Sequence, residues 1–183
     1  MVLLESLQLP MGQPMPSFKL ESPSKTVYSN SDLMGDKGLI ILFTCNHCPY
    51  AKAIWGRVIE LAKRVQPAGV NTVAINPNIN PGYPADSPEN MLKLIHDFDL
   101  PFPYLVDKDQ QIAKEYQAQC TPDIYVVTPD MRLFYHGRLD DNWQNESRVM
   151  SQDLLKAVDC LVQNQPSPSP QFPAMGCSIK WLQ

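Results

Sequence analysis

Apolar residues gather in short runs that are separated by polar segments rich in proline. The run from Lys37 to Thr44 is continuous and of strand length, which is typical of a central strand covered on both faces. The next apolar positions recur at spacings of three and four, which predicts a helix. They are Ala51, Ile54, Trp55, Val58, Leu61, Ala62 and Val65. Pro49 suits the front of this helix, because a missing N–H costs little there.

The rest of the chain continues to alternate between strand and helix patterns. Ser87 followed by Pro88 indicates a helix start, with Ser87 as N-cap. The predicted elements are a strand over 70–76, a helix over 88–98, a strand over 103–107, a helix over 111–117, a hairpin over 123–139 with its turn at Pro129-Asp130, and a helix over 147–163 with Met150, Leu154, Val158 and Leu161 on one face. Residues 1–37 predict only short extended pieces near Phe18, Leu20 and Val27.

This alternation predicts the fold class α/β, with a mixed central β-sheet flanked by helices and an N-terminal β extension. The late hairpin adds antiparallel strands to otherwise parallel pairs. The length of 183 residues suits one domain, which we expect over 1–165. Residues 166–183 then form a Pro-rich linker and a C-terminal tail that packs on the domain.

Composition narrows the function classes. Fifteen Lys and Arg against nineteen Asp and Glu give a net charge of −4, which argues against nucleic acid or an anionic membrane as a partner. No apolar run approaches the roughly 20 residues that span a bilayer. The first residues lack the basic start of a secretory signal, and Glu5 interrupts their apolar stretch, so a cytoplasmic location is expected.

The chemistry is expected at Cys45 and Cys48, two of five cysteines, which form a CxxC between a strand and a helix. A helix N-terminus favours an anion, and it therefore lowers the pKa of a thiol and promotes the nucleophilic thiolate. Cys45 precedes the helix and is expected to be exposed and to attack. Cys48 lies in the first turn and is expected to be more buried and to resolve the mixed disulfide. His47 between them is expected to stabilise a thiolate.

Two other readings of the CxxC stay open. It can be half of a zinc site, although the remaining cysteines are single and His96 and His136 are scattered. It can also be inert. The redox reading is favoured because of the strand–helix context.

Five segments in order make the chain resemble the thioredoxin-fold superfamily, and more closely its peroxiredoxin-like subgroup that carries a CxxC. They are FTCNHCPY at 43–50, YPADSPENM at 83–91, CTPDIYVV at 120–127, GRLDDNW at 137–143 and GCSIKW at 176–181. The resemblance implies a redox-active CxxC at Cys45 and Cys48. It also implies that Thr121-Pro122 is a cis-proline loop whose backbone docks an extended substrate peptide.

The sequence departs from the family patterns in two places. Asn46-His47 replaces the usual Gly-Pro dipeptide of thioredoxins, so these two residues are expected to tune the redox potential. The peroxiredoxin pattern PxxxTxxC is absent, since Thr44 stands four positions before Cys48 and residue 40 is Ile. This absence counts against efficient peroxidase activity.

Other residues are secondary candidates. Cys120 lies beside the expected cis-proline and Cys177 lies in the tail, and both are candidates for a redox relay or for simple packing. Cys160 on the last helix is expected to be inert. Asp140-Asp141 is an acidic pair that more often forms a solvated turn or a cap, with Arg138 as a plausible ion-pair partner. His136 is expected at the surface or satisfied by a partner.

The sequence therefore predicts a thiol–disulfide oxidoreductase without a cofactor. Its expected partners are a disulfide-containing protein or a small thiol or peroxide substrate, and a cellular thiol reductant as electron donor. The first alternative is a thiol peroxidase with antioxidant activity, in which Cys48 is peroxidatic and Cys45 resolves its sulfenic acid. The second alternative is a carrier or sensor of Cu(I) or Zn that binds through Cys45 and Cys48, with His47 or Cys120.

Overall fold

The computed structural model describes residues 2–182. Its strands are β1 (Leu3–Glu5), β2 (Lys19–Glu21), β3 (Val27–Ser29), β4 (Gly38–Phe43), β5 (Val70–Asn76), β6 (Tyr104–Val106), β7 (Cys120–Thr121), β8 (Asp123–Val127), β9 (Leu133–Gly137) and β10 (Met175–Ser178). Its helices are α1 (Asn30–Leu33), α2 (Pro49–Val65), α3 (Pro88–Phe98), α4 (Gln111–Glu115) and α5 (Asp153–Val162), with 3₁₀ helices at Gln66–Ala68, Pro84–Asp86 and Glu146–Arg148.

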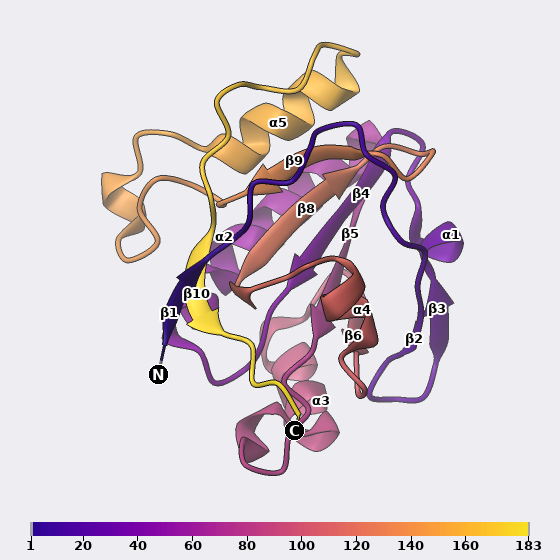
Figure 1. The fold of residues 1–183 in the computed structure, drawn as a ribbon, viewed down its shortest axis with the longest axis vertical. Helices are drawn as coiled ribbons and strands as arrows, with labels where there is room; N and C mark the ends of the chain where they lie inside the picture. The colour runs from indigo at the N-terminus through magenta and orange to yellow at the C-terminus, as the bar shows by residue number, and fades with distance from the viewer. Residues whose placement is uncertain (1, 183) are drawn as a thin grey trace.

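The central sheet has seven strands in the order β3-β2-β6-β5-β4-β8-β9 (Figure 1). Strand β4 lies between β5, to which it is parallel, and β8, to which it is antiparallel. Every residue of β4 is buried, as its continuous apolar run predicts. The mixed sheet expected from the sequence is therefore confirmed.

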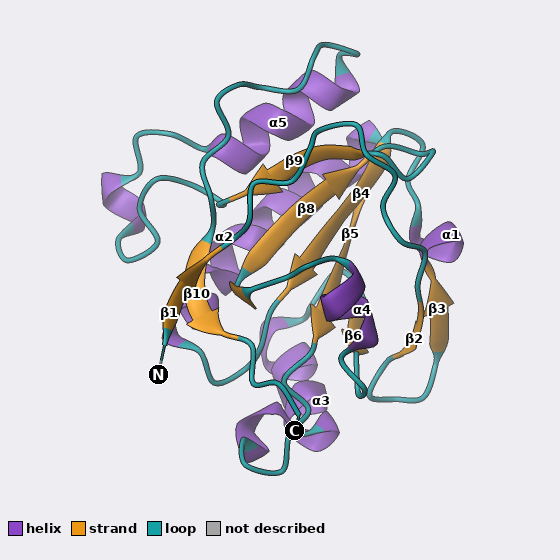
Figure 2. Cartoon of the chain, viewed as in Figure 1, coloured by secondary structure: helices purple, strands orange, loops and turns teal. Residues whose placement is uncertain are grey.

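Alternate residues of β4 feed two separate cores, because successive strand side chains point to opposite faces. Ile40 and Leu42 pack in a core with residues of α2, α3 and α5, whereas Leu39, Ile41 and Phe43 pack in a core with residues of α4. Figure 2 shows α4 in front of the sheet and α2 behind it. Both faces of the sheet are thus covered, and the turn after β4 is held between two packed layers.

A second, three-stranded sheet has the order β1-β10-β7 and is antiparallel throughout. It joins the first and last strands of the chain, which lie side by side in Figure 1. Leu4 pairs with Gly176, and Cys177 pairs with Thr121. The C-terminal strand therefore lies against the strand that leads into β8 and the centre of the main sheet.

The last helix begins later than the sequence pattern predicts. It starts at Asp153 rather than near residue 147, and Met150 is not on its apolar face but 89% exposed. The reason is a tertiary contact, because the Met150 N–H donates to the Asp141 carboxylate and the Asp141 N–H donates to the Ser151 carbonyl. These hydrogen bonds hold residues 150–151 outside regular secondary structure, while Glu146–Arg148 form only a 3₁₀ turn.

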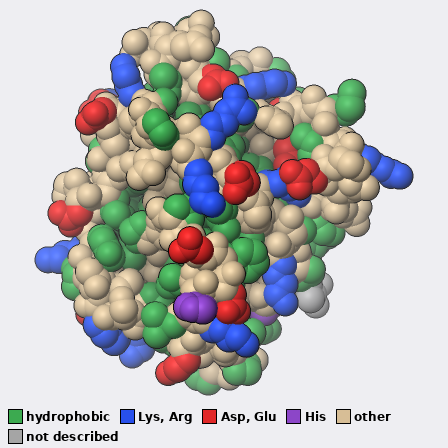
Figure 3. Space-filling model, turned by 180° about the vertical axis from the view of Figure 1, so that it is seen from behind, with side chains coloured by type: hydrophobic (Ala, Val, Ile, Leu, Met, Phe, Trp, Pro, Cys, Tyr) green, Lys and Arg blue, Asp and Glu red, His purple; other side chains and the backbone are tan. Residues whose placement is uncertain are grey.

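The surface agrees with the near balance of charges in the sequence. On the face seen from behind, acidic and basic side chains are interspersed rather than gathered by sign (Figure 3). Among the described residues, no helix combines the length and the apolar character needed to cross a membrane.

Candidate active site

The CxxC lies at the carboxyl end of β4, where the chain turns into α2. Cys45 follows the strand after Thr44, and Cys48 is the N-cap of α2. Pro49 occupies the first helical position, where its missing N–H costs no helical hydrogen bond. The strand–helix junction predicted from the sequence is therefore present, with Cys48 at the end of the helix that carries the positive partial charge.

The expected difference in exposure between the two cysteines is wrong. Cys45 and Cys48 are both 0% exposed. They belong to a small apolar cluster with Ala51 of α2 and Cys177 of β10. Strand β10 brings Cys177 against the two sulfurs and buries them. The residues next to the CxxC in the sequence do not predict this burial.

Three contacts connect the sulfurs to β7 and β10. The Cys48 Sγ lies 2.6 Å from the Cys177 Sγ and 3.1 Å from the Thr121 carbonyl oxygen. The Cys45 Sγ lies 3.2 Å from the Thr121 Oγ1. Thr121 therefore contacts both cysteines of the CxxC, while Cys177 is brought onto Cys48 in particular.

The environment ionises Cys48 before Cys45. The pKa of Cys48 is lowered from the ordinary 9.0 to about 5, first because the Cys45 thiol donates to it, and also because of hydrogen bonds from Cys177 and the Ala51 N–H; burial opposes the shift. The pKa of Cys45 is raised well above its ordinary value by burial first, then by its hydrogen bond to Cys48 and by the charge of Asp86. These directions favour Cys48 as the nucleophile, the reverse of the roles expected from the sequence.

Thr121-Pro122, the expected docking loop, faces the sulfurs, and its peptide bond is cis. The backbone of β7 is already paired, because Thr121 lies opposite Cys177 and Cys120 lies opposite Ser178. The edge at which we expect a substrate peptide is thus occupied by the protein's own C-terminal strand.

Asp86 is a site residue that the sequence reasoning did not single out. It is completely buried at the end of the 3₁₀ helix Pro84–Asp86. Its carboxylate pairs with the His47 Nδ1 and accepts hydrogen bonds from the Asn46 N–H at 2.6 Å and the Asn76 Nδ2 at 3.2 Å. Asp86 was visible in the sequence only as part of the segment YPADSPENM, because its partner His47 lies 39 positions away.

Asn46 and His47, the two residues inside the CxxC, contact the 83–86 segment that contains Asp86. The His47 ring lies against Tyr83, with centroids 4.9 Å apart, and its Nδ1 is taken by Asp86. The Asn46 side chain donates to the Ala85 carbonyl at 2.9 Å and accepts from the Tyr104 hydroxyl at 3.0 Å. Asn46 and His47 therefore clamp the turn in place, and their tuning of the redox potential stays a prediction.

A metal could be held beside the CxxC by a different set of residues from the one expected. Ligand atoms of Cys45, His47 and Asp86 lie within 4.8 Å of one another. Cys48 and Cys120 are not in this set. Three ligands leave one position of a tetrahedral site open, and the Asp86 carboxylate already accepts two other hydrogen bonds.

The remaining cysteines, Cys120 and Cys160, differ in burial and in their distance from the CxxC. Cys120 is buried, its Sγ is 3.5 Å from the Pro122 carbonyl, and burial is the main cause that raises its pKa far above the ordinary value. A role as a redox relay stays a prediction for this protonated thiol. Cys160 lies half-buried on α5, outside the cluster of sulfurs.

His136 and the acidic pair near residue 140 are structural in their contacts. The His136 Nε2 lies 2.8 Å from the Asp123 carboxylate, and both side chains are buried. The expected pairing of Arg138 with Asp140-Asp141 is wrong, because the Arg138 Nε instead donates to Asp153 at 2.6 Å.

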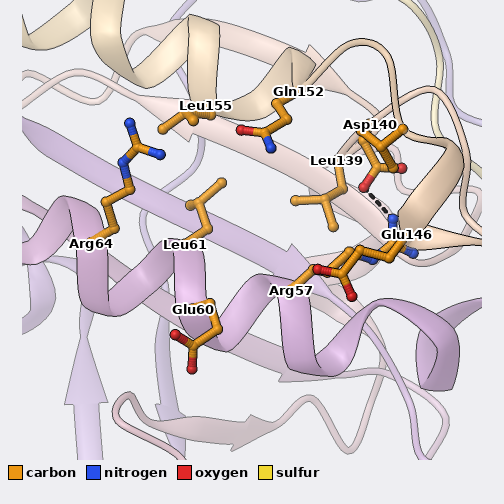
Figure 4. A pocket seen from close by; sticks show the side chains of 10 residues that line it. Arg57, Glu60, Leu61, Arg64, Leu139, Asp140, Glu146, Gln152 and Leu155 are labelled. Atoms are coloured by element: carbon orange, nitrogen blue, oxygen red, sulfur yellow. Dashed lines mark hydrogen bonds and ion pairs between the residues drawn. The ribbon is translucent and has the colours of Figure 1, made fainter.

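Arg57 of α2 takes the place expected for Arg138 and pairs with Asp140. It also donates to the carbonyls of Asn142 at 3.1 Å and Trp143 at 2.7 Å. The pair borders a cavity of about 460 Å³ between α2 and the segment that leads into α5 (Figure 4). None of the residues that line this cavity is a cysteine. Arg57 therefore secures the 140–143 loop to α2, the helix whose N-terminal end carries the CxxC.

Comparison with known proteins supports a thiol redox role. The model of the AhpC/TSA family matches residues 11–136. A search of curated proteins finds no match. Among solved structures, an uncharacterized conserved protein from Geobacillus kaustophilus is 41% identical, with 100% of this chain and 97% of that chain covered and a TM-score of 0.94.

Two further structures show the same architecture. A hypothetical protein from Sinorhizobium meliloti is 30% identical over 97% of this chain and 98% of that chain, with a TM-score of 0.92. The peroxidoxin BcpB from Mycobacterium tuberculosis is 16% identical over 84% of this chain and 97% of that chain, with a TM-score of 0.61, a likeness of fold alone. The fold is thioredoxin-like, as the sequence resemblance implies.

Proposed function

The chain belongs to the AhpC/TSA family, and from that membership and the geometry of the sulfurs we propose that it is a thiol–disulfide oxidoreductase in which Cys48 attacks and Cys45 resolves. The observation that carries this proposal is the difference between the two thiols. Cys48 has a pKa lowered to about 5 and is therefore a thiolate at neutral pH, while Cys45 keeps its proton and donates a hydrogen bond to it.

The proposed reaction is two successive exchanges. The Cys48 thiolate attacks one sulfur of a substrate disulfide, and the substrate S–S bond breaks. One substrate thiolate leaves, and the other half of the substrate stays bound to Cys48 as a mixed disulfide. Cys45 then gives its proton to the substrate thiolate released in the first exchange, and the resulting Cys45 thiolate attacks the Cys48 sulfur. The mixed disulfide breaks, the second substrate thiolate leaves, and the Cys45–Cys48 disulfide remains. The substrate gains two electrons, which the two protein thiols lose.

The test compares three single variants in the reduction of a small aromatic disulfide that releases a coloured thiolate. Cys48→Ser is expected to abolish activity. Cys45→Ser is expected to stop after one turnover with Cys48 held in a disulfide, either to the substrate or to the neighbouring Cys177, as detected by mass spectrometry. Cys160→Ser is the matched control, because this half-buried thiol lies outside the cluster of sulfurs, and it is expected to leave activity unchanged. Full activity of Cys48→Ser would refute the proposal.

A thiol peroxidase is the second candidate, and the complete burial of both sulfurs favours it. A peroxide is small enough to approach a site that is closed to a folded protein. In this reaction the Cys48 thiolate displaces water from the peroxide and becomes a sulfenic acid, and Cys45 then displaces the second oxygen as water. One equivalent of hydrogen peroxide should then oxidise Cys48 within the assay time. A Cys48 that stays a thiol under these conditions excludes the peroxidase.

A soft-metal carrier is the third candidate, and it rests on the cluster of Cys45, His47 and Asp86. It predicts Zn or Cu(I) in protein purified without a chelator, and loss of that metal in Asp86→Asn. Elemental analysis that finds neither metal, with no tight uptake of added Cu(I), removes this candidate. The cytoplasmic location and the thiol reductant that returns the electrons stay predictions.

A further inference from the structure

The C-terminal strand β10 occupies the position in which an extended substrate is expected to dock. Its Cys177 lies opposite Thr121 and its Ser178 opposite Cys120, in an antiparallel ladder. Pairing of an extended segment with an exposed strand edge is a general mode of peptide recognition. The Met175–Ser178 segment therefore meets β7 as a peptide ligand would, although it belongs to the same chain.

Gly176 makes this close approach possible. A Cβ at this position would lie 2.1 Å from the Thr121 carbonyl oxygen and 3.0 Å from the Pro122 nitrogen. Both atoms are backbone, so they cannot rotate out of the way as a flexible side chain would. The glycine just before Cys177 thus sets how near the strand comes to the Thr121-Pro122 loop.

The close approach of β10 to β7 brings the Cys177 sulfur next to the Cys48 sulfur. Cys177 is buried, and its Sγ lies 2.6 Å from the Cys48 Sγ. On its other side β10 is held by β1, with Leu3 opposite Cys177. The tail is therefore fixed on both edges, and the thiol that it carries is aimed at the proposed nucleophile. The family model ends at residue 136, so this strand lies beyond the matched segment.

We propose that β10 is a built-in substrate of the site and that Cys177 is a third redox cysteine, which exchanges with the Cys45–Cys48 disulfide. The Cys177 thiol loses its proton and attacks the Cys48 sulfur, the Cys45–Cys48 bond breaks, and Cys45 takes up a proton as it leaves. One disulfide replaces another, so no electrons enter or leave the protein. This inference rests on the proposed oxidoreductase function, because it needs the Cys45–Cys48 disulfide.

A consequence for external substrates follows from the same geometry. While β10 pairs with β7, it occupies the edge of Thr121 that faces it, and both CxxC sulfurs are buried. A protein disulfide reaches Cys48 only after β10 separates from β7. The Cys48–Cys177 disulfide is then the closed form of the enzyme, and a thiol reductant that opens it returns the site to use.

The test maps disulfides in Cys160→Ser protein after equilibration in glutathione buffers of graded ratio. Trypsin cleaves after Lys37, Lys52, Lys156 and Lys180. A Cys45–Cys48 disulfide therefore stays within the peptide 38–52, whereas a Cys48–Cys177 disulfide joins this peptide to 157–180. The expected result is both species, in a ratio that does not change with the glutathione potential, because the exchange between them transfers no electrons.

Cys45→Ser in the same background assigns the cross-link to Cys48, and it is expected to join 38–52 to 157–180 when oxidised. A Cys45–Cys48 disulfide without any cross-link at every buffer ratio would overturn the inference and leave the proposed function standing. A cross-link that forms without any Cys45–Cys48 disulfide would overturn the exchange. If Cys48 stays reduced at every ratio, the proposed function itself fails.

A second variant tests the strand rather than the sulfur. Gly176→Ala is expected to push β10 off β7, so the cross-link is lost and reduction of a protein disulfide becomes faster. Gly56→Ala in α2 is the matched control, because a Cβ there meets nothing within 4 Å, and it should change neither readout. A Gly176→Ala protein that is folded by circular dichroism and keeps the cross-link at the wild-type level would refute the built-in substrate.

Discussion

The ionisation of Cys48 gives the most direct test of the site, and removal of the Cys45 thiol is the informative change. The hydrogen bond from Cys45 is the largest cause that lowers the pKa of Cys48 to about 5. A hydrogen bond to a charged group contributes about 1.5–3 kcal/mol. Since one pH unit corresponds to about 1.4 kcal/mol, Cys45→Ala should raise the pKa of Cys48 to between about 6 and 7. Cys45→Ser should raise it less, because a hydroxyl still donates.

A single reaction rate measured at neutral pH does not reveal whether the pKa of Cys48 is lowered. With a pKa of about 5, Cys48 is about 99% ionised at pH 7, against about 1% for a thiol with a pKa of 9.0. This gain of about 100-fold in thiolate is largely cancelled, because nucleophilicity falls by about 40–100-fold over the same interval of four pH units. The midpoint of the titration therefore distinguishes the two cases, whereas the rate does not.

The assay follows the ultraviolet absorbance of the thiolate against pH, which requires no reagent to reach a buried sulfur. The difference between reduced wild-type protein and Cys48→Ser isolates the step that belongs to Cys48. Cys160→Ser should keep the step near pH 5, and Cys45→Ala should move it upward. A wild-type step near pH 9, or a step that Cys45→Ala leaves in place, would show that the Cys45 hydrogen bond does not stabilise a Cys48 thiolate.

Three further predictions concern stability. Between pH 5 and 9 the unfolded chain holds a proton that folded Cys48 lacks, so the free energy of unfolding of reduced protein should rise with pH, by at most about 1.4 kcal/mol per pH unit, and a Cys48→Ser protein with the same slope would contradict this. Asp86→Asn should lower the free energy of unfolding by about 3–5 kcal/mol in urea, because it breaks a buried pair, while the exposed Asp97→Asn should change little. Arg57→Met should lower the free energy of unfolding by about 3 kcal/mol in the same assay, because it leaves the buried Asp140 carboxylate without its partner. Lys63→Met, which removes an exposed pair with Glu60, should lower it by less than about 1 kcal/mol. Equal effects would refute the role given to Arg57.

The parts of the fold that the sequence predicted well are those whose signals are local. The apolar run of β4, the spacing of apolar residues along α2 and the Ser87-Pro88 start of α3 lie within single elements, and the structure confirms each of them. The start of the last helix was predicted wrongly, because contacts of Asp141 with Met150 and Ser151 compete with helix formation there. A hydrophobic pattern records burial along one element and contains no information about such a competitor.

The same division applies to the site. By itself the sequence determined that two cysteines stand between a buried strand and a helix that begins with proline, because strand length, apolar spacing and N-cap chemistry are properties of neighbouring residues. Only the tertiary structure decided which thiol ionises and what covers it. Cys177 reaches Cys48 across 129 positions, and Asp86 reaches His47 across 39. The pKa of a thiol depends on burial and on partners within a few ångströms, and chain folding alone brings those partners together.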